Sequence, residues 1–315
     1  MMETCSVITS NGETKTDDHV NHVNRVFIWC TPRSVSTAVL KSISKVPNSQ
    51  MWCEPFCFAN YCAPDGNYKE FMQWFKDSWG VDENEIDSVQ GGYLGRTSSY
   101  KWLAEQMESR PPNVKLIFVK ELAFGFDGHD LFSKIPKGFR HTFLIRHPYK
   151  VFASWKRMIN RGVVDTSKQM KLTDQPVYLL PKGYHFQEQY RIYRHVKQRI
   201  DPKPVVLDVD DLLNDPATYL KAYCEAVNIP YSEELLHWEA GREDMDNKWM
   251  VSKEEILADQ HGGHNRETFG STCFNKPKQC PDRLDLDEDV LHCSDSVLPY
   301  YNEMYENKLR VQSTN

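Results

Sequence analysis

Four short apolar runs lie along the chain, and each is long enough to form one buried strand. They cover residues 26–30 (VFIWC), 114–119 (VKLIFV), 141–145 (HTFLI) and 204–209 (PVVLDV). Continuous apolar runs of this length are typical of parallel strands that are buried on both faces of a sheet. The pattern therefore predicts a central parallel sheet.

Segments with helical spacing lie between these runs. In residues 185–200, one apolar stripe is formed by Phe186, Tyr190, Tyr193, Val196 and Ile200. Helical patterns also cover residues 38–46, 99–110 and 151–159, and Pro148 before the last of these suits the first turn of a helix. Strands that alternate with helices predict an α/β fold in which helices flank the sheet on both faces.

The chain has no internal repeat, low-complexity block or Gly/Ser linker, so we expect a single domain over residues 25–310. The polar residues 1–24 are expected to form a disordered N-terminal tail. Residues 242–281 are also polar and irregular, and we expect them to form loops over the sheet.

The composition narrows the choice of partners. The formal net charge is -6, so no overall basic field favours nucleic acid or an acidic membrane.

No apolar run approaches the roughly 20 residues of a bilayer span, and the first 24 residues contain no apolar core of a secretion signal. The nine cysteines have no repeating spacing and are expected to be reduced. We therefore expect a cytoplasmic protein without nucleic-acid or membrane partners, and the sequence leaves its oligomeric state open.

The segment Thr31-Pro32-Arg33-Ser34-Val35-Ser36-Thr37 joins the first apolar run to the first helical segment. In parallel sheets ligands bind beyond the carboxyl ends of the strands, and a turn that enters a helix offers backbone N–H groups to an anion. Arg33 adds a cation, and Ser34, Ser36 and Thr37 add hydroxyl donors, although an ordinary helix cap would carry the same hydroxyls. The glycines and the Lys-Ser/Thr pair of a Walker A motif are missing, which counts against an ATPase or a kinase.

A second candidate anion site follows the run at residues 141–145. Arg146 stands at the end of this run, and Ser154 comes eight residues later on the helix that Pro148 opens. A guanidinium can bind a phosphate through two parallel hydrogen bonds, and the hydroxyl can donate another. The alternative is an arginine in a salt bridge and a buried helical serine. Two anion sites at neighbouring strand ends suit a nucleotide with phosphates at both ends of its nucleoside.

In this order and context, the segments CTPRSVSTA and RHPYKVFAS resemble the sulfotransferase family that uses 3′-phosphoadenosine 5′-phosphosulfate (PAPS). The likeness is to a branch with a PRS-x-ST turn followed by an acidic-Pro-Phe element, here Glu54-Pro55-Phe56, and it covers residues 25–275. The resemblance implies a single domain with a P-loop-NTPase-like sulfotransferase fold. It also implies PAPS as co-substrate, 3′-phosphoadenosine 5′-phosphate (PAP) as product, and no requirement for a metal.

The resemblance assigns roles to both sites. The cofactor-binding turn comprises Thr31, Pro32, Arg33, Ser34, Val35, Ser36 and Thr37. Ser36 and Thr37 would hold the 5′-phosphate, and Arg33 would stabilise the oxygen that leaves with the nucleotide. Arg146 and Ser154 would bind the 3′-phosphate.

The segment 264–272 is similar to the family's late loop, which closes over the nucleotide. Within it, Arg266 and Ser271 would reach the 3′-phosphate or the adenine, and a plain surface loop is the alternative. His261 and His264 are the nearest candidates for a metal pair, but a solvent-facing loop is the favoured interpretation.

The proton acceptor has several candidates. Many relatives place a Lys-x-His element after the second strand; here Lys120 matches the lysine, and Leu122 replaces the histidine. We therefore assign a catalytic role to Lys120 and also to Glu54, whose aromatic surroundings suit a general base with a raised pKa. A structural carboxylate is the alternative for Glu54, and Glu121 and His129 are reserve candidates.

We therefore expect a sulfotransferase that moves a sulfuryl group from PAPS to a hydroxyl or amine of a small molecule by in-line displacement. A nucleotide-dependent phosphotransferase is one alternative, and it would use Asp208, Asp210 or Asp211 for Mg²⁺. A non-catalytic nucleotide-binding protein of the same fold is another. The sequence leaves open the identity of the acceptor and whether the sulfated product is released or eliminated.

Overall fold

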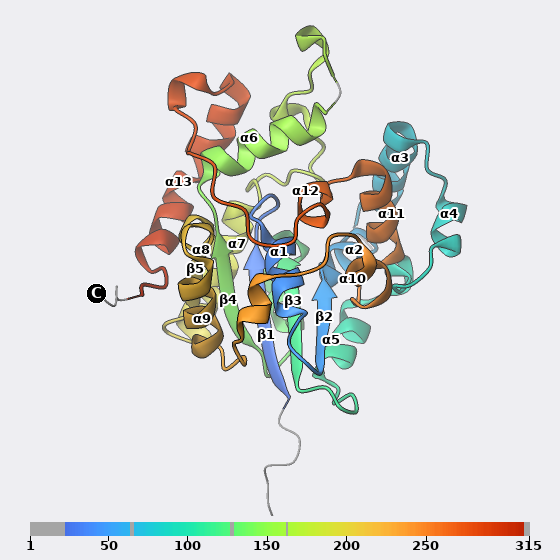
Figure 1. Cartoon of the computed structure of the whole chain (residues 1–315). Helices are drawn as coiled ribbons and strands as arrows, with labels where there is room; N and C mark the ends of the chain where they lie inside the picture. The colour runs from blue at the N-terminus through green and yellow to red at the C-terminus, as the bar shows by residue number, and fades with distance from the viewer. Residues whose placement is uncertain (1–22, 64–65, 127–128, 162, 312–315) are drawn as a thin grey trace, which may run out of the picture.

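The computed structural model describes residues 23–63, 66–126, 129–161 and 163–311 (Figure 1). Residues 1–22 of the predicted tail lie outside the described residues. Val23 is buried and Asn24 begins the first strand.

In the described part of the chain, five parallel strands form one sheet in the order β2-β3-β1-β4-β5. They are β1 (Asn24–Cys30), β2 (Ser49–Cys53), β3 (Leu116–Leu122), β4 (Arg140–Ile145) and β5 (Val205–Asp208). The predicted α/β fold with a central parallel sheet is therefore confirmed. β2 and β3 lie on one side of β1 in the sheet, and β4 and β5 lie on the other side. The carboxyl ends of β1, β3 and β4 thus form the edge where ligands of parallel sheets bind.

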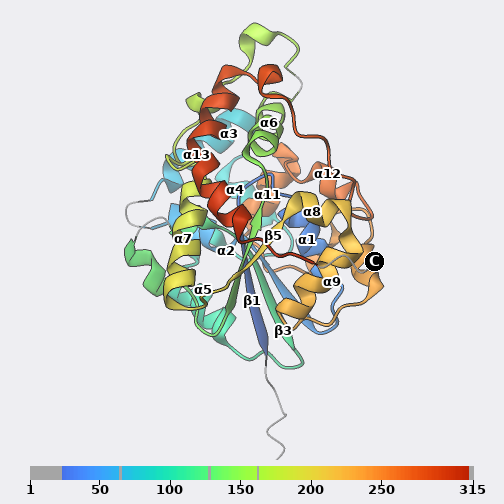
Figure 2. The same ribbon diagram turned by 90° about the vertical axis from the view of Figure 1, so that its left-hand side faces the viewer.

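Helices cover both faces of the sheet. Figure 2 shows α5 and α7 on one side of the strands and α1 and α9 on the other. The helices are α1 (Ser36–Ile43), α2 (Pro55–Tyr61), α3 (Tyr68–Trp79), α4 (Glu83–Ser88), α5 (Tyr100–Glu108), α6 (Pro148–Ile159), α7 (Phe186–Arg199), α8 (Val209–Asn214), α9 (Pro216–Ala226), α10 (Glu243–Asn247), α11 (Lys253–Gly262), α12 (Arg266–Phe269) and α13 (Glu288–Glu306). Short 3₁₀ helices cover Gly95–Thr97, Ala123–Phe126, His129–Lys134, Thr166–Lys168, Leu172–Asp174, Glu233–Leu236 and Arg283–Asp285.

The central strand separates two hydrophobic cores. Val26 and Ile28 of β1 point into the core that contains α1, whereas Phe27 and Trp29 point into the core that contains α7. This alternation is the two-residue period of a strand, and both faces are apolar because both are covered. The predicted stripe on α7 also faces its core, except that Ile200 follows the helix and is exposed.

Two strands depart from the sequence prediction. β2 was missed because only its last residues are buried, so that its sequence, SQMWC, does not form a continuous apolar run. β3 begins and ends later than the apolar run, because the polar residues Lys120 and Glu121 belong to the strand and pair with Ile28 and Trp29 of β1.

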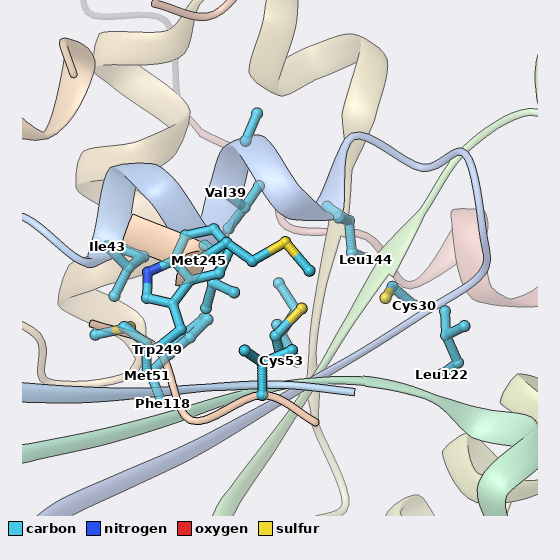
Figure 3. Packing of buried hydrophobic residues seen from close by; sticks show 14 of the residues in the cluster. Cys30, Val39, Ile43, Met51, Cys53, Phe118, Leu122, Leu144, Met245 and Trp249 are labelled. Atoms are coloured by element: carbon cyan, nitrogen blue, oxygen red, sulfur yellow. The ribbon is translucent and has the colours of Figure 1, made fainter. Parts of the chain in front are cut away.

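The late polar segment is more regular than predicted, since residues 242–281 contain α10, α11 and α12. Figure 3 shows Met245 and Trp249 beside Val39 and Ile43 of α1, in the core above the sheet. Met245 is fully buried, and burial of such a side chain contributes about 2 kcal/mol. The segment therefore helps to form the core rather than lying over it as loops.

None of the helices in the described part of the chain combines the length and the apolar character that a bilayer span needs. The cysteines among the described residues are free, and most are buried.

Candidate functional site

The turn after β1 is closed by its own hydrogen bonds and not by glycines. The Ser34 hydroxyl donates to the Thr31 carbonyl at 2.6 Å, and the Val35 carbonyl accepts from the N–H of Ala38 at 3.0 Å. Arg33 and Val35 both have left-handed backbone, with φ of 62° and 64°. This conformation costs a non-glycine residue on the order of 1 kcal/mol, and such strain is often found at ligand sites. The turn thereby starts α1 and fixes the direction of the Arg33 side chain.

A cavity of about 840 Å³ lies beyond the carboxyl ends of β1, β3 and β4. Among the described residues, its cationic lining consists of Arg33, Lys120, Arg146, Arg157, Arg161, Arg266, Lys276 and Lys278. Its carboxylates are Glu54, Glu255 and Glu267. Because the whole chain has a net charge of -6, this excess of positive charge is local to the cavity. The cavity therefore favours an anionic ligand.

Most residues predicted to bind the nucleotide lie in the wall of this cavity. They are Pro32, Arg33, Val35, Ser36, Thr37, Arg146, Ser154, Arg266 and Ser271. Thr31 and Ser34 are fully buried and do not line the cavity. The Ser34 hydroxyl, which the sequence analysis assigned to an anion, is engaged inside the turn, so only its backbone remains a predicted contact.

The two predicted anion sites meet in one place. The Arg33 Nε donates to the Ser154 hydroxyl at 3.2 Å, and an Arg146 Nη donates to the Arg33 carbonyl at 2.6 Å. The Arg146 Nε is buried and has no hydrogen-bond partner among the described residues. Burial lowers the pKa of both guanidinium groups, and neighbouring arginines add to that effect. An anion between them would offset both costs.

The late segment contacts the same turn. The Thr37 hydroxyl donates to the Asn265 side chain at 2.8 Å, and an Arg33 Nη donates to the His264 carbonyl at 2.5 Å. The N–H of Asn265 donates to the Asp259 carboxylate on α11 at 2.7 Å. Of the two predicted late-loop residues, Arg266 is exposed at the cavity. The hydroxyl of Ser271 instead donates to the Thr268 carbonyl at 2.7 Å.

Lys120 and Glu54 form an ion pair in the cavity wall. The Lys120 side chain is 4% exposed and that of Glu54 is 14% exposed. Although burial lowers the pKa of Lys120, the adjacent Glu54 more than offsets this, and the net pKa lies well above its usual value. Glu54, which the sequence suggested as a candidate base because of its aromatic neighbours, therefore has Lys120 as an ion-pair partner.

Glu121, one of the two reserve bases, lies outside the cavity. Glu121 is fully buried, does not line the cavity, and accepts from the N–H groups of Phe56 and Leu122 at 2.8 and 2.9 Å. Burial raises the pKa of Glu121 to about 8, and the contact with Phe56 places its carboxylate at the start of α2. The side chain of His129 lies outside the described part of the structure.

The cavity wall also contains charged side chains that were not predicted from the sequence to lie there, among them Arg157, Arg161 and Glu255. Arg157 and Arg161 follow Ser154 on and after α6, and extending the helical periodicity from Ser154 would have found them. Glu255 on α11 and His264 after it form a pair, with the His264 Nε2 3.1 Å from a Glu255 oxygen. His264 was predicted to begin the late loop 264–272 and was named with His261 as a candidate metal pair, and no local signal connects it with Glu255.

The aspartates proposed for a phosphotransferase have other partners. Asp208 accepts from the N–H groups of Asp210 and Asp211 at 3.0 and 3.1 Å and so caps α8. Asp210 pairs with Lys150 at 2.7 Å, and Asp211 pairs with Lys308 at 2.5 Å. Asp208, Asp210 and Asp211 do not line the cavity, so the site offers no support for this alternative.

Fold and site together define a parallel α/β protein with a cationic cavity at the carboxyl edge of its sheet. No protein-family model matches the chain. Two curated relatives from Arabidopsis thaliana are named branched-chain-amino-acid aminotransferase-like proteins 1 and 2, and both are 24% identical to this chain. The matches cover 88% of this chain but 41% and 40% of the relatives, so the chain spans about two fifths of their length.

Similar solved structures are sulfotransferases. The sulfotransferase domain of the Synechococcus PCC 7002 olefin synthase has a TM-score of 0.42 and 16% identity, and the match covers 87% of this chain and 94% of that chain. The sulfotransferase domain from the curacin biosynthetic pathway has a TM-score of 0.41 and 14% identity, with 88% and 98% covered. A mouse sulfotransferase complexed with PAP has a TM-score of 0.38 and 12% identity, with 92% and 86% covered.

Proposed function

We propose that the protein is a sulfotransferase that binds PAPS and transfers its sulfuryl group to a hydroxyl or amine of a small molecule. The observation that carries the proposal is the convergence of Arg33, Arg146 and Ser154 in one cationic cavity. PAPS presents a phosphosulfate and a 3′-phosphate at opposite sides of one nucleoside, and it needs cations for both. The proposal also follows from the order and spacing of the two motifs along the chain.

Different residues of the cavity would bind the two phosphates and stabilise the leaving oxygen. Ser36 and Thr37, at the start of α1, would hold the 5′-phosphate. Arg33 would stabilise the oxygen that takes up negative charge as the sulfur–oxygen bond breaks, an interaction that strengthens in the transition state. Arg146 and Ser154 would hold the 3′-phosphate, which would give the unpartnered Arg146 Nε an acceptor.

Thermal stabilisation by nucleotides tests the donor site without knowledge of the acceptor. A ligand present at 100 times its dissociation constant adds about 2.7 kcal/mol of stability. We expect PAP to raise the melting temperature more than 5′-AMP or Mg²⁺-ATP does. In Arg146→Gln the preference for PAP over 5′-AMP should shrink by about tenfold in affinity or more, because a charged hydrogen bond contributes about 1.5–3 kcal/mol.

Other results of this nucleotide comparison would count against parts of the proposal. Equal stabilisation by PAP and 5′-AMP would contradict the 3′-phosphate site, and preference for Mg²⁺-ATP would favour a phosphotransferase. Pyridoxal 5′-phosphate belongs in the comparison because the Arabidopsis relatives are named aminotransferase-like. An absorbance change showing its imine with a cavity lysine would count against our proposal.

Sulfuryl transfer itself is measured as PAP released from PAPS in the presence of small alcohols, phenols and amines. We expect release to depend on the acceptor and to persist in EDTA, since Arg33 provides the positive charge at the leaving oxygen. Loss of transfer in EDTA would contradict this assignment to Arg33. A soluble cytoplasmic enzyme without nucleic-acid or membrane partners is part of the same proposal.

A further inference from the structure

A histidine and two carboxylates face one another where α11 ends at the cavity. Gly263 ends the helix with a left-handed φ of 58°, and this brings His264 back over the helix. The His264 Nε2 lies 3.1 Å from the nearest Glu255 oxygen and 3.6 Å from the nearest Asp259 oxygen. His264 and Glu255 both line the cavity, and their side chains are 26% and 16% exposed. The imidazole is thus oriented by carboxylates and still reached from the cavity.

The geometry assigns different tasks to the two ring nitrogens. Nε2 faces carboxylate oxygens, which accept hydrogen bonds, so this nitrogen carries a proton. Nδ1 then has its lone pair available, and the described residues offer it no hydrogen-bond partner. A histidine whose one nitrogen is held by a carboxylate and whose other nitrogen is free has the arrangement of a general base.

The position of His264 ties it to the expected reaction centre. Its backbone carbonyl accepts from an Arg33 Nη at 2.5 Å, and Arg33 is the residue proposed to stabilise the leaving oxygen. The cavity wall beside it contains Glu54 and Lys120, which neutralise each other in their ion pair. Glu54 and Lys120 are engaged with each other, whereas the Nδ1 of His264 has no hydrogen-bond partner among the described residues.

We propose that His264 is the general base of the transfer reaction and that Glu255 is its positioning residue. The acceptor would be a small molecule that reacts through a neutral hydroxyl group. As the acceptor oxygen bonds to sulfur, its proton would pass to the Nδ1 of His264. The bond between sulfur and the bridging phosphate oxygen would break, and the electron pair would remain on PAP. This inference rests on the proposed function and names a base for it.

The charges around the imidazole set the expected pH dependence. Burial lowers the pKa of His264, but the hydrogen bond to Glu255 and the charges of Glu255, Asp259 and Glu54 raise it above its ordinary value overall. Arg33 contacts the backbone of the same residue, and Lys120 lies near Glu255. A base must be unprotonated, so the transfer rate should rise with pH through this raised pKa. Removing the charge of Glu255 destabilises the imidazolium and should move the rise to lower pH.

The test compares His264→Gln and Glu255→Gln with His261→Gln, a matched control because His261 is exposed on α11 and does not line the cavity. PAP should stabilise all three variants as it stabilises the wild type. His264→Gln should reduce transfer by about 10²–10⁴-fold and remove the pH dependence. Glu255→Gln should keep a pH dependence but shift it to lower pH, and His261→Gln should match the wild type.

Nuclear magnetic resonance of labelled histidine provides a readout that needs no acceptor. We expect His264 to carry its proton on Nε2 when neutral and to titrate above the usual imidazole range, with a lower pKa in Glu255→Gln. Wild-type transfer by His264→Gln, or an unchanged His264 pKa in Glu255→Gln, would overturn the assignment. Failure of PAP to stabilise the wild type is a different result, since it would overturn the proposed function itself.

Discussion

The two ends of the cavity are built from different chemistry. Around Arg33 and Arg146 the charges are guanidinium groups, which keep their protons at any physiological pH even where burial lowers their pKa. The other end contains two pairs of a nitrogen base and a carboxylate, Lys120 with Glu54 and His264 with Glu255. The difference indicates that one end is suited to holding an anion and the other to moving a proton.

The two ends also differ in how the chain forms them. The arginine end comes largely from one continuous turn, residues 31–37, and from the strand end beside it. The titratable end gathers residues from the junction of β2 and α2, from β3, from α11 and from the turn after α11. A ligand-binding turn can therefore be encoded locally, while the proton-transfer end depends on the whole fold.

Among the three comparisons that follow, the largest effect is expected at the arginine end. Arg33→Gln keeps the length for a hydrogen bond to Ser154 but removes the charge, and we expect transfer to fall by about 10²–10³-fold, as for loss of one oxyanion donor. PAP binding should weaken much less, because the charge on the leaving oxygen is largest in the transition state. Single-turnover rates and PAP titrations on the same preparation separate the two effects.

Arg146→Gln is the matched variant for this prediction. It should weaken PAP binding more than it slows the single-turnover rate with saturating PAPS. If the two variants had the same ratio of binding loss to rate loss, the division of roles between the two arginines would be wrong.

The next effect concerns the titratable end. Lys120→Met leaves Glu54 without its partner in a mostly buried position, and removing one member of a buried ion pair costs about 3 kcal/mol. The free energy of unfolding in urea should fall accordingly, and the double variant Lys120→Met/Glu54→Gln should recover part of the loss. A single variant within about 0.5 kcal/mol of the wild type, the range of ordinary surface substitutions, would show that the pair contributes little to stability.

The sequence predicted those parts of the fold that have local signals. β1, the turn after it, β4 and α6 each combine an apolar run or a helical period with characteristic end residues, and the structure has them at the expected places. Most of the cavity residues found from sequence belong to these segments or directly follow them, whereas Glu54, Lys120, Arg266 and Ser271 come from elsewhere in the chain. Their roles in nucleotide binding are still predictions, but their convergence followed from the parallel sheet, which brings strand ends together.

The remaining parts depend on contacts between distant segments. The Lys41 Nζ on α1 donates to the carbonyls of Glu239 and Gly241 at 2.8 Å each, and Arg242 pairs with Asp259 on α11. These contacts fix the late segment in place. Its apolar residues do not recur at a clear helical spacing, so its helices could not be predicted from the local sequence pattern. The pair of His264 with Glu255 depends on that arrangement and so was missed.

The smallest effect tests whether the late segment is held over the arginine end by the contacts seen here. Asn265→Ala removes the acceptor of the Thr37 hydroxyl and should cost about 1 kcal/mol. Hydrogen exchange should become faster in residues 264–272, whereas the exposed control Asn247→Ala on α10 should leave exchange there unchanged. PAP affinity should change less than fivefold, because the freed Thr37 hydroxyl becomes available to the 5′-phosphate and offsets the loss of order. Unchanged exchange in Asn265→Ala would instead mean that the remaining contacts, such as those of Arg33 with the His264 carbonyl and of the Asn265 N–H with Asp259, are enough to hold the segment. The two ends of the cavity would then be joined through the same arginine that is proposed to stabilise the leaving oxygen.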